Sequence, residues 1–290
     1  AGIEGGLDRS NVTVMNPIYD IPLQQTLAPF LQLRRSIGGG WSFVSGLRAD
    51  YRRVNPGNNF SPRVFKALSP KLSISYRQPS KGILFISVNK GFRAPSLSEL
   101  YLLHASSYGL FLQGTPSLNP ESVWALELGY KHEHSKNLFW KLQFYHNHYR
   151  DMIDFVYAVP VKALNWQSVS SSGAEFQLQT KLRNDLKVSF DYSFLYMKNL
   201  TGDAPLLYRP KHKINGTLFF HKKNLMTSLS GRFVSRQLYE DFLSHDYELI
   251  DNRVIFPLKW MPSLFLANAN FSYKFRSFMF SVKIENIFDS

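Results

Sequence analysis

Histidine offers this chain its most versatile chemistry, because imidazole binds metal ions and exchanges protons near neutral pH. His146 and His148 lie two residues apart, so in a strand they share one face at a spacing compatible with a metal ion. No third ligand is evident near them, whereas protein zinc sites use three or four ligands. We therefore interpret the pair as histidines at an interface or facing a wet interior, and expect no metal site there.

The sequence contains no recognisable active-site pattern of an enzyme. We find no nucleophile elbow, HExxH, P-loop or paired-carboxylate motif. His146 with a nearby serine could form a base–nucleophile pair, but no motif supports that reading. The absence of cysteine rules out disulfides and cysteine-based zinc or iron–sulfur sites. We therefore expect no catalytic residue, no metal site and no resident cofactor.

The charge balance is strongly basic, with 34 Lys and Arg against 21 Asp and Glu and a formal net charge of +13. Such a charge is compatible with a nucleic-acid surface. The basic residues are scattered, however, and form no Lys/Arg block, so we favour solvated loops, turns and a polar interior, with contacts to anionic lipid. No nucleic-acid partner is expected.

The hydrophobic pattern has a period of two along most of the chain. In one run, Trp124, Leu126 and Leu128 alternate with small or charged residues. Such runs are about ten residues long, carry charges in their polar rows and have aromatic residues near their ends, as in membrane-spanning strands. Because no apolar stretch approaches the ~18 residues of a membrane helix, we predict an all-β, transmembrane, antiparallel up-and-down β-barrel.

Short and long connections alternate along the chain. We expect short turns near residues 35–40, 78–81, 133–137, 183–185, 221–224 and 275–276, and long connections near 53–70, 90–121, 150–165, 198–211 and 236–261. This asymmetry is typical of outer-membrane barrels. Only residues 96–103, after Pro95, favour a helical turn. About a dozen strands are expected, at roughly 25–36, 41–53, 69–78, 82–90, 122–133, 138–150, 165–182, 186–198, 211–221, 224–236, 262–275 and 277–287.

Five segments match the sequence boxes of one family, in the expected order. They are GFRAPSLSELY at 91–101, LSPKLS at 68–73, GTPSLNPE at 114–121, SGAE at 172–175 and IENIFD at 284–289. Together they resemble the GFRAP, LSPKL, GNPxLxPE, small-Gly-x-Glu and NLFD boxes of TonB-dependent outer-membrane receptors. Thr115 stands where the box usually has asparagine. The matches extend over most of the chain.

The resemblance implies a location in the outer membrane of a Gram-negative bacterium and a role in energy-coupled import. Such receptors have an N-terminal plug that contacts the TonB–ExbB–ExbD complex, followed by a barrel of twenty-two strands. We therefore expect residues 1–290 to be the C-terminal portion of such a barrel, without the plug, the early strands and the closing strand. The alternative is a passive porin-like or phospholipase-type outer-membrane barrel, which would need no plug.

The resemblance also implies where a ligand would bind. The expected ligand is a scarce nutrient, either an iron complex (a siderophore chelate or haem) or cobalamin. The loop at 90–121 combines aromatic and hydrogen-bonding side chains suited to a bulky ligand. Arg93 could meet an anion or serve a structural role at the rim. His104 could bind haem iron or be a surface histidine. The candidate contacts are Arg93, Tyr101, His104, Tyr108, Phe111 and Gln113. Lipopolysaccharide, other outer-membrane lipid and a surface lipoprotein are further expected partners.

Overall fold

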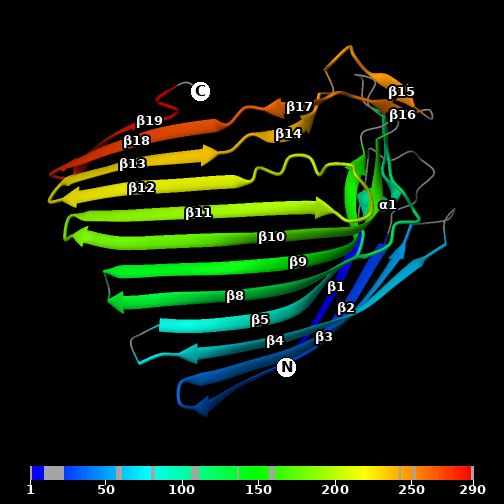
Figure 1. Cartoon of the computed structure of the whole chain (residues 1–290), viewed down its shortest axis with the longest axis horizontal. Helices are drawn as coiled ribbons and strands as arrows, with labels where there is room; N and C mark the ends of the chain where they lie inside the picture. Colours follow the sequence, from blue (N-terminus) through cyan, green and yellow to red (C-terminus); the bar gives the residue numbers. More distant parts are fainter. Residues whose placement is uncertain are drawn as a thin grey trace.

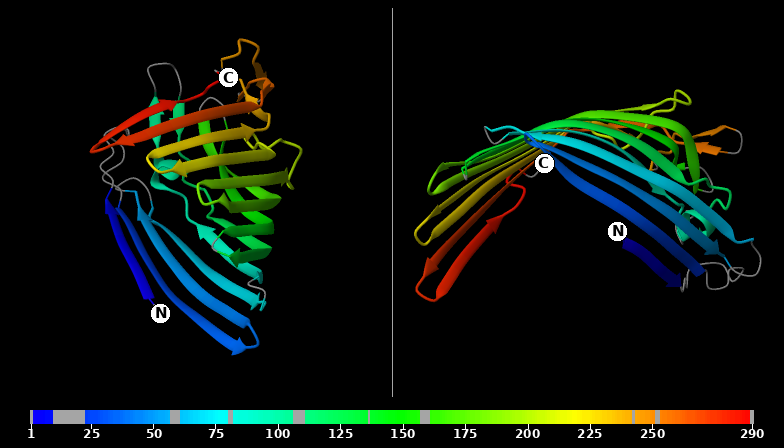
Figure 2. Two further views of the ribbon diagram at one scale, coloured as in Figure 1. Left: turned by 90° about the vertical axis from the view of Figure 1, so that its left-hand side faces the viewer. Right: turned by 90° about the horizontal axis from the view of Figure 1, so that it is seen from below.

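A computed structural model provides the structure, and it describes residues 2–9, 23–56, 61–79, 82–105, 111–135, 137–156, 161–241, 243–250 and 253–288. Among these residues, fifteen strands form a single curved sheet that is open along one side (Figures 1 and 2). This confirms the predicted all-β, antiparallel class. The described residues include no helix long and apolar enough to cross a membrane.

Thirteen strands follow one another along the main path of the sheet, each paired with its neighbours in an antiparallel ladder. The two outermost strands of this path, β1 and β19, lie at opposite edges and do not pair with each other. The bounds are β1 (Gly2–Arg9), β2 (Leu23–Gly38), β3 (Trp41–Asn55), β4 (Arg63–Arg77), β5 (Gly82–Arg93), β8 (Glu121–Ser135), β9 (Leu138–Val156), β10 (Val161–Arg183), β11 (Leu186–Asn199), β12 (His212–Lys222), β13 (Leu225–Val234), β18 (Leu264–Phe275) and β19 (Phe278–Ile284).

The two ends of the strands differ, as the connection lengths predicted. Tight turns join the strands at one end, on the left in Figure 1, and we call it the turn end. The other end, called the rim, bears α1 (Leu97–Tyr101), β6 (Leu103–Ala105) and β7 (Phe111–Gln113). The rim also bears two small antiparallel ribbons, β14 (Gln237–Glu240) with β17 (Leu258–Met261) and β15 (Glu248–Ile250) with β16 (Arg253–Ile255).

Two of the predicted long connections were wrong, because the strands continue beyond the segments with clear alternation. β3 and β4 stay paired up to Val54 and Arg63, so most of the predicted connection 53–70 is strand. In the same way β9 and β10 stay paired up to Val156 and Lys162. The backbone ladder needs only N–H and C=O groups, so it extends where side chains no longer alternate. Strand β1, which lacks a marked apolar pattern, was not predicted.

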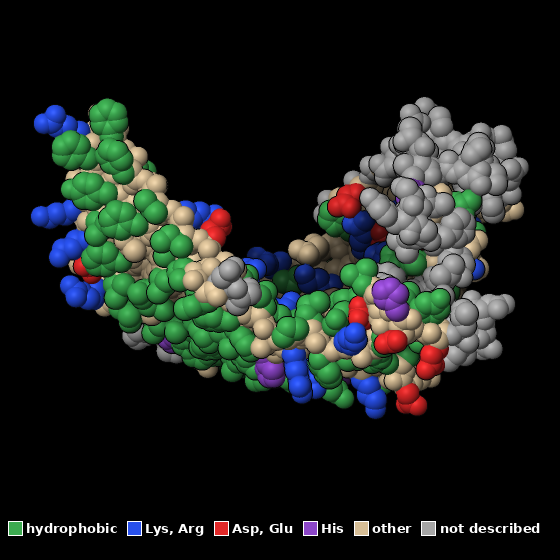
Figure 3. Space-filling model, turned by 90° about the horizontal axis from the view of Figure 1, so that it is seen from above, with side chains coloured by type: hydrophobic (Ala, Val, Ile, Leu, Met, Phe, Trp, Pro, Cys, Tyr) green, Lys and Arg blue, Asp and Glu red, His purple; other side chains and the backbone are tan. Residues whose placement is uncertain are grey.

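The two faces of the sheet have opposite character. On the convex face, large apolar side chains such as Leu72, Ile86 and Leu126 are 42–49% exposed. Figure 3 shows apolar side chains gathered over this face and charged ones in the hollow. Such an arrangement is expected where hydrocarbon covers one face and water the other.

The principal hydrophobic core lies at the rim, where α1 packs onto the concave side. Its buried members are Val54, Phe65, Ala94, Leu100, Tyr101, Leu118, Ile153 and Ala163. They come from β3, β4, β9, β10 and the segment between β5 and β8. A single-layered sheet has no interior of its own, so this cluster is what holds the rim segments in place.

Candidate functional site

An ionic clamp around Arg93 organises the rim. Arg93 is the last residue of β5, and its Nε atom donates a hydrogen bond to Oε2 of Glu121 at 2.6 Å. Its Nη1 atom donates to both carboxylate oxygens of Glu99, each at 2.9 Å. Glu121 opens β8, and its other oxygen accepts the backbone N–H of Ile153 at 2.5 Å. The clamp thus ties α1 to three consecutive barrel strands through charge-assisted bonds.

The helix α1 is short, and its N-terminal cap accounts for its presence. Ser96 and Glu99 form a capping box, in which each side chain accepts the other's backbone N–H. Burial raises the pKa of Glu99, but hydrogen bonds from the Ser96 backbone, from Arg93 and from the Ser96 hydroxyl outweigh it and hold this pKa below its ordinary value. Glu99 is therefore ionised at neutral pH and completes the clamp. The predicted helical turn after Pro95 is confirmed.

The structure separates the six residues predicted to contact a ligand. Arg93 is engaged by two carboxylates, which agrees with the structural role considered for it. Tyr101 is only 2% exposed and belongs to the rim core. His104 and Gln113 are half-buried on the ribbon formed by β6 and β7. Phe111 is the first residue of β7. Tyr108 lies outside the described residues. No observation tests their contact with a ligand, so that role stays a prediction.

A lumen cavity of about 630 Å³ lies on the concave face below the rim. Its walls come from β5, β8, β9, β10 and β11, and it contains two tyrosines, Tyr145 and Tyr149. Its acidic groups are hydrogen-bonded, because Gln143 donates to Glu175 at 2.5 Å and Ser87 donates to Glu127 at 3.4 Å. This cavity combines aromatic surface with fixed polar groups, the usual lining of a site for a bulky ligand.

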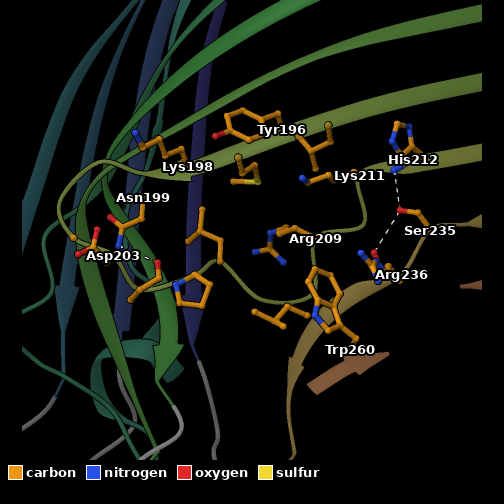
Figure 4. A pocket seen from close by; sticks show the side chains of 17 residues that line it. Tyr196, Lys198, Asn199, Asp203, Arg209, Lys211, His212, Ser235, Arg236 and Trp260 are labelled. Atoms are coloured by element: carbon orange, nitrogen blue, oxygen red, sulfur yellow. Dashed lines mark hydrogen bonds between the residues drawn. The ribbon is translucent and has the colours of Figure 1, made fainter. Parts of the chain in front are cut away.

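A second cavity, of about 600 Å³, lies beside it where β11 runs past the end of β12, and we call it the rim cavity. Leu195, Met197 and Arg209 line both cavities. Among the residues lining the rim cavity, Asp203 carries the one carboxylate. The basic and aromatic side chains around it are Tyr196, Lys198, Arg209, Lys211, His212, Arg236 and Trp260 (Figure 4).

Aromatic rings support the cations of the rim cavity. The Arg236 guanidinium lies 4.7 Å from the centre of the Trp260 ring, and the Lys211 ammonium lies 5.9 Å from that of Tyr196. Cation–π contact holds such groups without neutralising them. The arrangement is suited to an anion that also has a flat, apolar surface. Our reading of the sequence missed this cavity, although the cluster YRPKHK at 208–213 was a signal for it.

A histidine–serine pair does occur on the convex face. The Nδ1 atom of His146 and the Oγ atom of Ser172 are 2.8 Å apart, on neighbouring strands β9 and β10. Within the described part of the chain, no carboxylate or amide hydrogen-bonds to the other ring nitrogen, so the pair lacks the orienting group of a catalytic triad. No group of three or more potential metal ligands occurs within the described part of the chain.

A curved sheet with an apolar outer face, a polar hollow and a ligand-sized cavity at its rim defines an outer-membrane receptor-type barrel. The sequence matches the family described as "TonB dependent receptor-like, beta-barrel" over residues 5–287. The chain therefore belongs to the TonB-dependent receptor family, and it forms part of an outer-membrane barrel. The resemblance noted in its sequence boxes is confirmed.

Relatives of this chain include receptors and transporters. It is 26% identical over 259 residues to the iron-regulated outer membrane virulence protein of Vibrio cholerae, covering 80% of this chain and 38% of that protein. Among solved structures, the copper transporter OprC has a TM-score of 0.73 at 17% identity, over 93% of this chain and 42% of its own. The siderophore receptor PirA from Acinetobacter baumannii has a TM-score of 0.71 at 18% identity, and the match covers 92% of this chain and 42% of PirA. The chain spans about two fifths of these relatives' lengths.

Proposed function

We propose that this chain is the C-terminal part of the barrel of a receptor that imports an anionic iron complex, such as a ferric siderophore, in a TonB-dependent manner. The observation that carries the proposal is the rim cavity, where four basic side chains and two aromatic rings line a space that shares three lining residues with the lumen cavity. Its positive charge attracts anionic chelates, and its rings offer surface to their aromatic or apolar parts.

Energy for import would come from the TonB–ExbB–ExbD complex, acting through a plug held inside the complete barrel. The unpaired edges of β1 and β19 support a longer barrel, since an open sheet edge is unfavourable in a membrane. Capture and release of a chelate require no bond-making by this chain. A surface lipoprotein that delivers the ligand is a further candidate partner.

Binding to the full-length receptor tests the proposal. We would measure quenching of tryptophan fluorescence by ferric catecholate and hydroxamate siderophores, haem, cobalamin and Cu²⁺. The double variant Arg209→Gln/Arg236→Gln removes two cations of the rim cavity. We expect its affinity for the bound chelate to fall at least tenfold, because each charge-assisted contact is worth about 1.5–3 kcal/mol.

The matched control is Lys222→Gln/Lys274→Gln, which removes two exposed cations at the turn end. It should bind as the native receptor does. Equal affinity of the rim-cavity variant and the native protein for every ligand that binds would refute the placement of the site. Haem binding that is lost in His104→Ala would instead support the haem alternative on the β6–β7 ribbon.

A further inference from the structure

A third cavity lies on the concave face close to the turn end, where β9, β10, β11 and β12 approach their tight turns, on the left in Figure 1. Its volume is about 620 Å³, and we call it the turn-end cavity. Its lining residue Gln179 is an even number of positions from Glu175, which lines the lumen cavity on the same strand. Because side chains alternate along a strand, the turn-end cavity faces the same hollow, at the end of the lumen opposite the rim.

Two lysines line this cavity, and they lie directly opposite each other in the ladder between β10 and β11. They are Lys181 and Lys187, and opposite side chains on one face of a ladder have Cβ atoms only about 4.5–5.5 Å apart. Like charges at that spacing destabilise the ladder. Among the described residues that line the cavity there is no Asp or Glu. Asp185, which lies between the two lysines in the sequence, is paired with Arg183 at 3.4 Å.

A second pair of opposed lysines on the same face shows how such a repulsion is compensated within the chain. Lys131 on β8 lies opposite Lys141 on β9. The Lys131 ammonium forms an ion pair with Glu133 at 2.6 Å, and the Lys141 ammonium lies 5.7 Å from the ring centre of Phe85. Within the described part of the chain, the lysine pair of the turn-end cavity has no such carboxylate. It therefore offers two positive charges to an anion from outside the chain.

The remaining lining of the turn-end cavity narrows the class of anion. Phe139 from β9 and Phe219 from β12 contribute aromatic rings, and both are half-buried. Ser189 and Thr217, which are paired between β11 and β12, contribute hydroxyl groups that can donate to an oxygen atom. An inorganic anion such as phosphate would use the charges and leave the rings without a partner. An oxyanion carried on an aromatic ring would use all of these groups.

We propose that the turn-end cavity is a second ligand site of the barrel, which binds an aromatic oxyanion between Lys181 and Lys187 with its ring beside Phe139 and Phe219. The bound anion relieves the repulsion between the two ammonium groups, so the ladder itself gains stability when the site is occupied. The identity of the natural occupant rests on the proposed function: it is an anionic aromatic arm of the chelate that the rim cavity captures. The turn-end cavity then serves the passage of the chelate out of the lumen rather than its capture.

Lysine acylation of the full-length receptor, followed by mass spectrometry of its peptides, tests the site directly. The reagent is sulfo-N-hydroxysuccinimide acetate, and the probe is 2,3-dihydroxybenzoate, with cyclohexanecarboxylate and inorganic phosphate as ring-free comparisons. We expect acylation of Lys181 and Lys187 to slow about tenfold when the probe is at about ten times its Kd, because only unoccupied sites react. Acylation of Lys131 and Lys141 should not change. Phe219→Leu, which keeps all four lysines, should weaken protection by the aromatic probe.

Uptake of a ferric catecholate by cells supplies the second measurement. Lys181→Gln/Lys187→Gln should bind the chelate at the cell surface with native affinity but import it several-fold more slowly. The control Lys131→Gln/Lys141→Gln removes the other opposed pair from the same face and should import at the native rate. A heat-dependent shift in gel mobility verifies that each variant is folded.

Several outcomes would overturn the proposal. They are acylation that the probe does not slow, equal protection of the control lysines, and equal protection by the ring-free anions. Lysines of the cavity that are already unreactive without any probe would assign the cavity to another segment of the full-length receptor. A receptor that imports an anionic chelate but shows no protection would refute this site alone. Protection in a receptor that imports none of the anionic chelates would instead refute the proposed function and the natural occupant, and leave the site.

Discussion

Arg93 and Lys90 stand three residues apart on β5, yet the sheet gives their charges different surroundings. Arg93 faces the hollow and is held by Glu99 and Glu121. Lys90 faces outward beside an apolar groove, and no described carboxylate lies within ion-pair distance of it. The same residue class therefore joins segments through ion pairs on one face of a strand and makes no ion pair with a described residue on the other.

The largest expected effect on stability comes from removing the positive charge of Arg93 on the concave face. Arg93→Met leaves two partly buried carboxylates without their cation, and we expect the free energy of unfolding to fall by about 2–4 kcal/mol, less than for a fully buried pair because Arg93 is partly exposed. The midpoint of urea unfolding in lipid vesicles, measured on the full-length receptor, gives the change. A loss below about 0.5 kcal/mol, the level of a surface substitution, would contradict the clamp.

A steric change at the same site should have the next largest effect. A Cβ on Gly114 would lie 2.5 Å from the backbone nitrogen of Tyr101 and 2.6 Å from the carbonyl carbon of Leu100. Because backbone atoms cannot rotate away, Gly114→Ala should push α1 off the rim and cost about 1–3 kcal/mol. The matched control is Gly202→Ala, since a Cβ there meets nothing within 4 Å. Equal unfolding midpoints for the two variants would show that α1 tolerates displacement.

Acidification should weaken the clamp more gently. The pKa of Glu99 is lower in the folded protein than in the unfolded chain, so ionised Glu99 stabilises the folded state. This stabilisation is complete above the ordinary carboxyl pKa and declines as the pH falls towards the pKa of Glu99 in the folded protein. We expect hydrogen exchange at the amides of Leu100 and Leu102, corrected for intrinsic rates, to speed up below about pH 4. Glu99→Gln should remove this pH dependence. The same acid response in that variant would assign the effect to another group.

The smallest effect is expected on the outer face. Lys90→Met repeats the substitution used for Arg93 on the same strand but breaks no ion pair, so the free energy of unfolding should change by less than about 0.5 kcal/mol. The same urea titration measures it, in vesicles without anionic lipid. A loss as large as that for Arg93→Met would remove the distinction between the two faces.

The turn end of the barrel was readable from the sequence, and the rim was not. Strand boundaries at the tight turns agree with expectation to within about two residues, for example at the end of β10, expected at 182 and found at Arg183, because alternation and turn residues are local signals. At the rim, ladder pairing continued beyond the predicted strand ends, as far as Val54 with Arg63 and Val156 with Lys162, without a clear side-chain period. The rim cavity was missed because its lining comes from segments far apart, including 195–212 and Trp260.

What the sequence determined by itself is the class of protein. Three sequence patterns indicate that class: the period of two, the alternation of short and long connections, and the family boxes. Each pattern depends on residues close together in the chain, so it can be recognised without knowledge of the fold. The tertiary structure alone decided which carboxylates Arg93 binds and that Phe139 and Phe219 line one cavity. Those facts depend on strand register, which brings together residues up to dozens of positions apart in the chain. The GFRAP segment thus contains both a local signal that is visible in its sequence and an arginine whose ionic role is defined only by its partners in the fold.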